Sequence, residues 1–307
     1  MRNDGYTYRD RITYADAGVT LLEFYATRYA HSSAAEWSRH ITDGLVERNG
    51  TVETNPDASL RADDRLAWHR PPWDEEDVPT DIPVLAESAG WMVLRKPSGI
   101  PVLPGGGFLR NTLLWIARER HGGLMSPVHR LGRGTSGAIL FSRSADAARE
   151  LARAMREGEI RKTYLALVQG CEMPDHFTVD APIGPVPHAP VGMLHAASPV
   201  GKASVSHCRV LRRDPAAGQT LLEVDIPTGR PHQIRIHCAF AGHPLVGDPL
   251  YRAGGLPLDT GAVPGDCGYF LHSWQIRFPD PDSGEMMHVT APPPETLDAG
   301  RGVCYYK

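Results

Sequence analysis

The chain has 307 residues, enough for one large domain or for two smaller domains with separate buried cores. Its net charge of −4 excludes a protein that coats nucleic acid by bulk positive charge, although a local basic groove is compatible with this composition. The sequence has no stretch typical of a signal peptide or of a membrane-spanning helix, so we expect a cytoplasmic location without membrane contact.

Residues 1–73 are predicted to form a small N-terminal module. Apolar residues at near four-residue spacing predict two short helices, one starting at Leu21 and one containing Trp37 and Ile41, before strand and turn patterns over residues 47–68. This order, with the closing run DRLAWHRPP, resembles the S4 RNA-binding module. A small α+β cap on the larger domain is the alternative interpretation.

Residues 74–81 are predicted to be a linker, because two prolines precede them and the four acids from Asp74 to Asp77 favour a solvated chain. Residues 82–307 then form one larger domain in which strands predominate. Strands are expected at 82–85, 92–94, 160–168, 203–211 and 221–226, and helices at 111–120 and after the N-cap residue Ser144. The expected fold class is α+β, a mixed, largely antiparallel sheet with flanking helices.

The most informative stretch is VHRLGRGTSGAILFSR, residues 128–143. A polar loop with three glycines runs directly into the apolar strand 138–141, and glycine lets the backbone turn sharply or approach a ligand closely. The side chains of His129, Arg130 and Arg133 suit a phosphate or another anion. From these residues alone, a basic turn before a buried strand is an equally good interpretation.

The pattern His-Arg-Leu-x-Arg-x-Thr-Ser-Gly before an apolar strand resembles the active-site motif of the RluA-type pseudouridine synthases, which isomerise uridine in RNA to its C-glycoside. Four further elements match this family in order: Lys-Pro-x-Gly at 96–99, Lys-x-Tyr at 162–164, Gly-Arg-x-His-Gln-Ile-Arg at 229–235 and Gly-Asp at 247–248. The resemblance implies the pseudouridine synthase fold, tRNA or rRNA as the partner, and no metal or organic cofactor. We expect a monomer.

The resemblance also implies a role for each matching residue. Tyr164 packs on the uracil and takes part in removing the C5 proton, and Arg230 pairs with the catalytic aspartate of the motif. His129 and Arg130 lie where the target base leaves its stack. The remaining residues that it implies in RNA binding are Lys96, Arg133, Thr135 and Lys162.

The sequence departs from the family at Gly132, which stands where the motif has its catalytic aspartate. A carboxylate there acts as a nucleophile or stabilises a developing cation, and glycine does neither. Three accounts stay open. The chain is a catalytically silent relative that binds RNA, or Asp248 or Asp225 supplies the carboxylate, or Gly132 lets the substrate come closer. The intact neighbouring motif residues favour an active enzyme.

Neither the cysteines nor the histidines predict a metal site. The five cysteines are scattered, without a Cys-x-x-Cys pair, which is typical of reduced thiols: Cys171, Cys208, Cys238, Cys267 and Cys304. His232, His237 and His243 are close in sequence. On a helix that begins near His232, however, the first two lie about 140° apart, so one shared metal is not expected.

Overall fold

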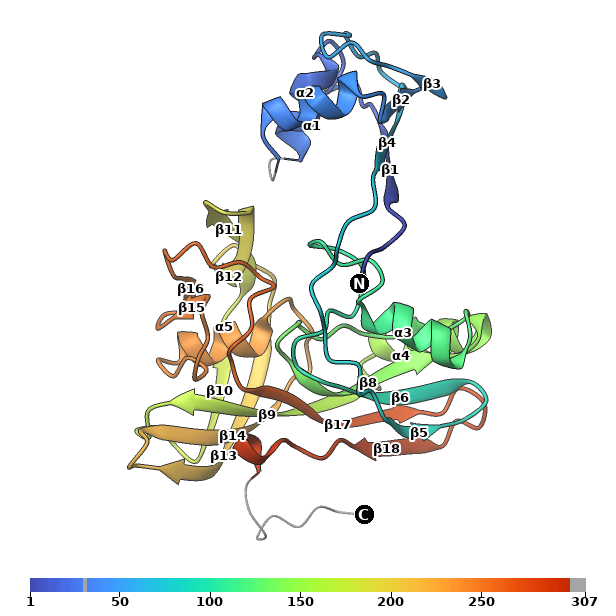
Figure 1. Ribbon diagram of the computed structural model, residues 1–307. Coiled ribbons are helices and arrows are strands. Elements are labelled where there is room, and N and C mark those ends of the chain that lie inside the picture. Colours follow the sequence, from blue (N-terminus) through green and yellow to red (C-terminus); the bar gives the residue numbers. More distant parts are fainter. Residues whose placement is uncertain (30–31, 299–307) are drawn as a thin grey trace. The chain divides into compact units, whose positions relative to one another are not determined.

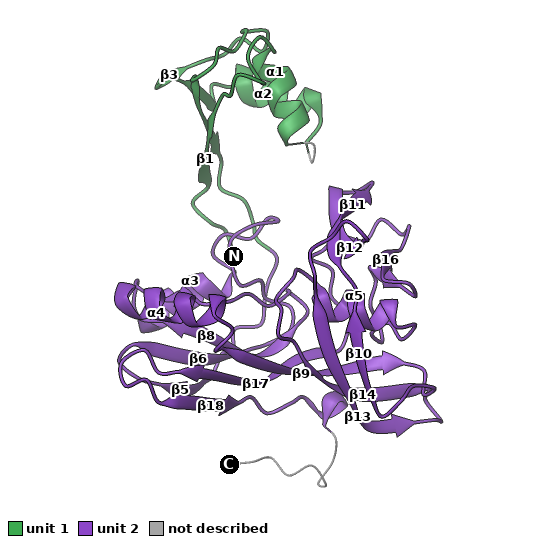
Figure 2. Ribbon diagram, turned by 180° about the vertical axis from the view of Figure 1, so that it is seen from behind, with its two compact units in different colours: residues 1–75 green, residues 76–307 purple. Residues whose placement is uncertain are grey.

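The computed structural model describes residues 1–29 and 32–298, so Cys304 lies outside the described residues. The chain forms two compact units, residues 1–75 and 76–307 (Figure 2). Within the described part of the chain, no helix has the length and apolar character needed to cross a membrane.

The boundary between the units falls inside the stretch predicted as a linker, but its acids are not all free in solvent. Glu75 is buried, and its carboxylate accepts a hydrogen bond of 2.8 Å from the Asn3 side chain. Glu76 forms an ion pair with Arg133. These carboxylates therefore belong to the ends of the two units, because each finds a partner far away in sequence.

Unit 1 (residues 1–75) contains β1 (Tyr6–Arg11), α1 (Leu21–Arg28), α2 (Ala34–Thr42), β2 (Val46–Arg48), β3 (Thr51–Val52) and β4 (Arg65–Arg70). Thr20 and Ser33 cap the two helices, each in a capping box with a glutamate three residues later. The fully buried Trp37 stacks on Tyr25 with 4.8 Å between ring centroids. The two predicted helices are therefore confirmed, while the S4 resemblance stays a prediction.

Unit 2 (residues 76–307) is built on a ten-stranded sheet. Its strands are β5 (Val84–Glu87), β6 (Trp91–Lys96), β7 (Ser126–Pro127), β8 (Ser136–Ser142), β9 (Arg161–Gln169), β10 (His176–Asp180), β13 (Val205–Asp214), β14 (Gln219–Asp225), β17 (Leu271–Pro279) and β18 (Met286–Thr290). The order is β10-β13-β14-β9-β17-β8-β6-β5, with β18 beside β17 and β7 beside β8. Only β8 and β17 pair in parallel in the described residues, which confirms the mixed, largely antiparallel sheet.

Three helices flank this sheet: α3 (Leu113–His121), α4 (Ala145–Arg156) and α5 (Gln233–Phe240). A short 3-10 helix, Glu295–Leu297, follows the last strand. Helices α3 and α4 lie at the end of the sheet that contains β6 and β8, but on opposite faces of it, because α3 shares a cluster with Met92 and Leu94 and α4 with Trp91 and Val93. Helix α5 lies at the end that contains β9 and β10 (Figure 1). The Ser144 hydroxyl accepts a hydrogen bond from the Ala147 backbone N–H, which confirms the predicted N-cap of α4.

Two small hairpins cover α5. Strands β11 (Ile183–His188) and β12 (Gly192–Ala197) form one of them, and β15 (Tyr251–Arg252) and β16 (Leu256–Pro257) form the other. Ile236 and Ala239 of α5 share an apolar cluster with residues of both hairpins. The helix is therefore buried over most of its length, and its N-terminal end is held in a fixed position.

Candidate active site

A small cavity of about 90 Å³ is lined by segments that are far apart in sequence. They are the loop 130–135, Tyr164 of β9, residues 226–235 at the start of α5, and residues 269–271 at the start of β17. Three arginines lie in this lining, Arg130, Arg230 and Arg235. Among the described residues, no aspartate or glutamate lines the cavity. Its charge therefore suits an anion or a polarised heterocycle.

Tyr164 reaches the cavity from the face of β9 that packs on the apolar core. Only 5% of the residue is exposed, and Ala166 and Val168 on the same face belong to the same apolar core. Burial raises the pKa of Tyr164 to about 12, although the neighbouring Ser273 hydroxyl acts to lower it. The phenol is therefore protonated at neutral pH.

Arg230 enters the same cavity from the turn before α5. Its Nε and Nη2 lie 3.4 and 3.3 Å from the Ala203 carbonyl oxygen, which are long contacts to a single acceptor. Among the described residues, no carboxylate lies within ion-pair distance of this guanidinium. The charge is therefore available to a ligand. The backbone N–H of Arg230 donates to the Gln233 side chain over 3.1 Å, which fixes the turn.

Lys96, expected to contact RNA, is instead fully buried. Its ammonium group donates hydrogen bonds to the carbonyl oxygens of Pro97, Arg133 and Thr135 at 3.0, 3.0 and 2.7 Å. Burial lowers the pKa of Lys96 to about 7, while three carbonyl dipoles favour the charged form. Lys96 therefore fixes the backbone of the loop 133–135 through hydrogen bonds and does not face solvent.

Arg133 also fastens the loop. Its Nε donates to the Gly99 carbonyl oxygen over 2.9 Å, its Nη2 pairs with Glu76, and its guanidinium lies 4.7 Å from the Phe108 ring centroid. Thr135 is 4% exposed, and its hydroxyl oxygen lies 3.3 Å from the Tyr269 hydroxyl oxygen. Both residues were expected to contact RNA, but in this structure their side chains hold other parts of the protein.

The two residues that start the motif have different surroundings. His129 Nε2 accepts a hydrogen bond of 3.2 Å from the Leu140 backbone N–H, which continues the pairing of β7 with β8. Burial, and then the charge of Lys162, lower the pKa of His129 to about 3, so the imidazole is neutral. Arg130 is exposed and lines the cavity. Of this pair, Arg130 is the side chain free to meet RNA.

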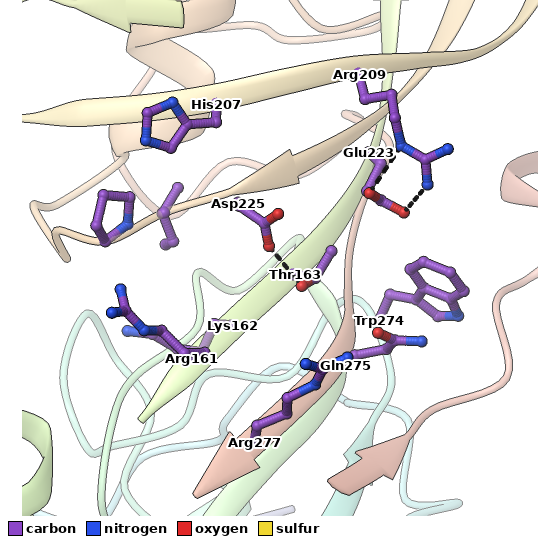
Figure 3. Close-up of a pocket in the computed structure, with 12 residues that line it drawn as sticks. Arg161, Lys162, Thr163, His207, Arg209, Glu223, Asp225, Trp274, Gln275 and Arg277 are labelled. Atoms are coloured by element: carbon purple, nitrogen blue, oxygen red, sulfur yellow. Dashed lines mark hydrogen bonds and ion pairs between the residues drawn. The ribbon is translucent and has the colours of Figure 1, made fainter. Parts of the chain in front are cut away.

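Lys162 does not line this cavity but the open groove that also contains Asp225 (Figure 3). Its Nζ is 3.9 Å from the Met155 sulfur, and burial lowers the pKa of its ammonium group. Among the described residues, no acid is within ion-pair distance of Lys162. A partly buried cation without a carboxylate suits a phosphate, in keeping with the expected RNA contact.

Gly132 is in close contact with Tyr269. A Cβ atom at residue 132 would lie 2.7 Å from the Tyr269 hydroxyl oxygen and 3.3 Å from the Thr135 hydroxyl oxygen. The φ angle of Gly132 lies outside the left-handed region, so the backbone conformation itself does not require glycine. The hydroxyl of Tyr269 therefore occupies the space in which a side chain at residue 132 would begin.

Asp248, the first alternative carboxylate, is already engaged. Its oxygens accept hydrogen bonds of 2.8 and 2.7 Å from Arg235, and the side chains are only 2% and 1% exposed. One oxygen also accepts from the backbone N–H of Leu250 over 2.9 Å. The Arg235 guanidinium lies between this carboxylate and the Tyr269 ring, 4.1 Å from the ring centroid. Asp248 therefore acts on the cavity through Arg235.

Asp225, the second alternative carboxylate, lies on the other face of the sheet. Strands β14 and β9 pair so that Val224 is opposite Tyr164 and Asp225 is opposite Thr163, and successive side chains of a strand point to opposite faces. The Asp225 carboxylate accepts a hydrogen bond of 2.6 Å from Thr163 in an open groove (Figure 3). It does not reach the cavity that Tyr164 lines.

Comparison with known proteins gives the family. The family described as RNA pseudouridylate synthase matches residues 90–240. An uncharacterized RNA pseudouridine synthase of Synechocystis sp. is 42% identical over 280 residues, which cover 90% of this chain and 95% of the relative. RNA pseudouridine synthase 5 of Arabidopsis thaliana is 37% identical over 348 residues, covering 96% and 94%. Ribosomal large subunit pseudouridine synthase D of Vibrio parahaemolyticus is 31% identical over 302 residues, covering 92% and 90%.

A solved structure agrees with these relatives. Human RNA pseudouridylate synthase domain containing 1 is similar with a TM-score of 0.58 and 25% sequence identity, over 73% of this chain and 90% of that one. The chain therefore belongs to the RNA pseudouridine synthase family.

Sequence reasoning missed Tyr269 and gave no separate role to Arg235. Arg235 closes the Gly-Arg-x-His-Gln-Ile-Arg element, but nothing in that pattern indicates that its guanidinium lies on a tyrosine 34 residues later. Tyr269 stands at the end of a glycine-rich loop, in no motif. The one feature of the sequence related to Tyr269 is the pair of glycines at 132 and 134, and their contact with Tyr269 appears only in the folded chain.

Proposed function

We propose that this chain isomerises uridine to pseudouridine in a structured RNA, tRNA or rRNA, at the cavity between the 130–135 loop and α5. Family membership gives the reaction. The observation that supports this cavity is the meeting of Tyr164, Arg230 and Gly132 from three separate segments. We further propose that the protein acts in the cytoplasm as a monomer.

The lining suits a uracil that has left its stack. Leu131, Ile226 and Leu271 supply apolar contacts for the ring, and Tyr164 lies beside them. Arg230, held only by long contacts, supplies a cation to a uracil oxygen or a phosphate. Isomerisation moves one bond at ribose C1′ from N1 to C5, so it needs no oxidant, reductant or cofactor.

A second function, RNA binding without turnover, is favoured by one observation. Within the described part of the chain, no carboxylate lines the cavity, and the carboxylates of Asp248 and Asp225 are already engaged by Arg235 and Thr163. A protein of this kind retains RNA, with an affinity that falls steeply as salt rises, and releases no hydrogen from uridine C5.

Release of tritium from RNA labelled at uridine C5 separates the two functions. The substrates are unmodified transcripts of tRNAs and of large-subunit rRNA, with protein in excess so that one turnover is followed. We expect the wild type to release tritium and Tyr164→Phe to release it at least about 100-fold more slowly while still retaining RNA.

Arg230→Ala and Arg161→Ala form a matched pair for this experiment. Both remove one arginine, but Arg161 lines the groove on the opposite face of the sheet (Figure 3). Only Arg230→Ala should slow release. Wild-type protein that retains RNA but releases no tritium would establish the binding function, and equal effects of the two arginine variants would contradict the proposed cavity.

A further inference from the structure

The loop that carries Gly132 is shaped around one tyrosine. A Cβ at residue 132 would lie 2.7 Å from the Tyr269 hydroxyl oxygen, and a Cβ at residue 134 would lie 2.9 Å from two carbons of its ring. Neither Gly132 nor Gly134 has φ in the left-handed region. Both glycines are therefore needed because of Tyr269 and not because of the turn.

Tyr269 is held in place before any substrate arrives. The residue is 4% exposed, with Arg235 stacked 4.1 Å from the ring centroid on one side. Arg235 is itself fixed by its two hydrogen bonds to Asp248. The hydroxyl lies 3.3 Å from that of Thr135. A polar group fixed in this way is preorganised, because it needs no rearrangement when charge develops beside it.

The charge of the cavity decides which developing charge a fixed polar group there can stabilise. Breaking the bond between N1 and C1′ leaves negative charge on the uracil and positive charge on the ribose. Arg130 and Arg230 line the cavity without a carboxylate in ion-pair distance among the described residues, whereas the charge of Arg235 is balanced by Asp248. These surroundings stabilise the negative charge on the base and not the positive charge on the sugar.

Tyr269 fits that task as a hydrogen-bond donor. Burial raises the pKa of its phenol, although the charge of Arg235 acts to lower it, so the hydroxyl keeps its proton at neutral pH. A protonated phenol is a poor nucleophile toward C1′, but it donates a strong hydrogen bond to an oxygen that is gaining charge.

We propose that the Tyr269 hydroxyl is the catalytic group that takes the place of the aspartate, and that it donates a hydrogen bond to a uracil carbonyl oxygen as the glycosidic bond breaks. This role rests on the proposed function. The electron pair of the N1–C1′ bond passes to the uracil, where Tyr269 and Arg230 stabilise it. After the ring turns, an electron pair of C5 forms the new bond to C1′. The C5 proton passes to water by way of the Tyr164 hydroxyl, which gives up its own proton as it takes this one, and N1 takes up a proton, so the sum is an isomerisation.

Tyr269→Phe tests this role, because it removes the hydroxyl and keeps the ring against the two glycines and Arg235. We expect tritium release from the C5-labelled transcripts to fall at least about 100-fold, the usual loss for one donor to a developing anion. Retention of the same RNA should change less than threefold. A purely structural tyrosine would leave the release rate unchanged in this variant.

Tyr251→Phe is the matched control. The Tyr251 ring also lies near Arg235, at 5.1 Å, but its hydroxyl is bonded to His232 and to the His195 carbonyl oxygen. We expect release within threefold of the wild type. Adding Gly132→Asp to Tyr269→Phe should recover release, because the carboxylate then enters the vacated space. Gly132→Asp alone should not increase release, because Tyr269 still fills that space.

Two results would overturn the inference, and they differ. If Tyr269→Phe releases tritium as fast as the wild type, the role of Tyr269 is excluded while the proposed function stands. If the wild type retains the transcripts but releases nothing from them, the proposed function fails and the role of Tyr269 fails with it.

Discussion

Replacing Gly132 with alanine measures how closely this residue and Tyr269 fit together. The added methyl group would lie 2.7 Å from the Tyr269 hydroxyl oxygen, and such a contact forces one of the two groups to move. Tyr269 is almost fully buried beneath Arg235, so the movement is resisted. Overpacking of this kind costs about 1–3 kcal/mol of unfolding free energy.

In a Tyr269→Phe background, Gly132→Ala should leave the free energy of unfolding almost unchanged. The hydroxyl oxygen is the only Tyr269 atom within 3 Å, and the next one, Cζ, lies 4.0 Å from the added Cβ. The Thr135 hydroxyl at 3.3 Å needs only a small shift. Alanine also restricts the unfolded chain, which stabilises the protein by about 0.4–1 kcal/mol. Tyr269→Phe by itself should lose about 1 kcal/mol or less, because its one hydroxyl contact is long.

Urea unfolding of the four proteins gives the coupling free energy directly. We expect a coupling of about 1–3 kcal/mol between the two sites, confined to the transition of unit 2. Unit 1 has its own core and should unfold at the same urea concentration in all four proteins, which makes it an internal control. A cost of alanine that is equal in both backgrounds, with a coupling under about 0.5 kcal/mol, would refute the reasoning.

Two further predictions concern stability. Lys96→Met should destabilise unit 2 by about 2–4 kcal/mol, because three carbonyl oxygens lose their shared donor, whereas Lys162→Met should cost less than about 1 kcal/mol; equal losses in urea unfolding would contradict the role of Lys96 in the loop. Because the pKa of His129 is lowered to about 3 in the folded protein, the unfolded chain binds more protons below about pH 6.5, and stability should fall as the pH drops from there toward 3. The His129→Gln variant keeps an acceptor for the Leu140 N–H, and its free energy of unfolding should fall less steeply with decreasing pH than that of the wild type. The two slopes should differ by at most about 1.4 kcal/mol per pH unit, and parallel curves for the two proteins would exclude this contribution.

The sequence by itself determined the family resemblance, the class of fold and most of the elements. The N-cap residue Ser144, the alternation around Tyr164 and the apolar strand after the glycine loop are local patterns, so short-range rules were enough to predict them. The same holds for Arg230, whose motif places it in the turn before α5.

Only the tertiary structure decided what several polar residues do. Lys96 looks like any basic residue beside a turn, but the strand that carries it runs under the glycine loop, and burial turns the ammonium group toward carbonyl oxygens. Strand register likewise places Asp225 on the face away from Tyr164, and sequence spacing holds no information on which strands become neighbours.

Gly132 shows the division most clearly. From the sequence, the residue is only a missing carboxylate in a familiar motif. In the folded chain, the parallel pairing of β8 with β17 brings the start of β17 beside the loop, and Tyr269 at that point fills the space above Gly132. A contact between residues 137 positions apart depends on how the sheet assembles. For that reason the sequence determined that residue 132 has no side chain, while only the tertiary structure decided that the Tyr269 hydroxyl lies in its place.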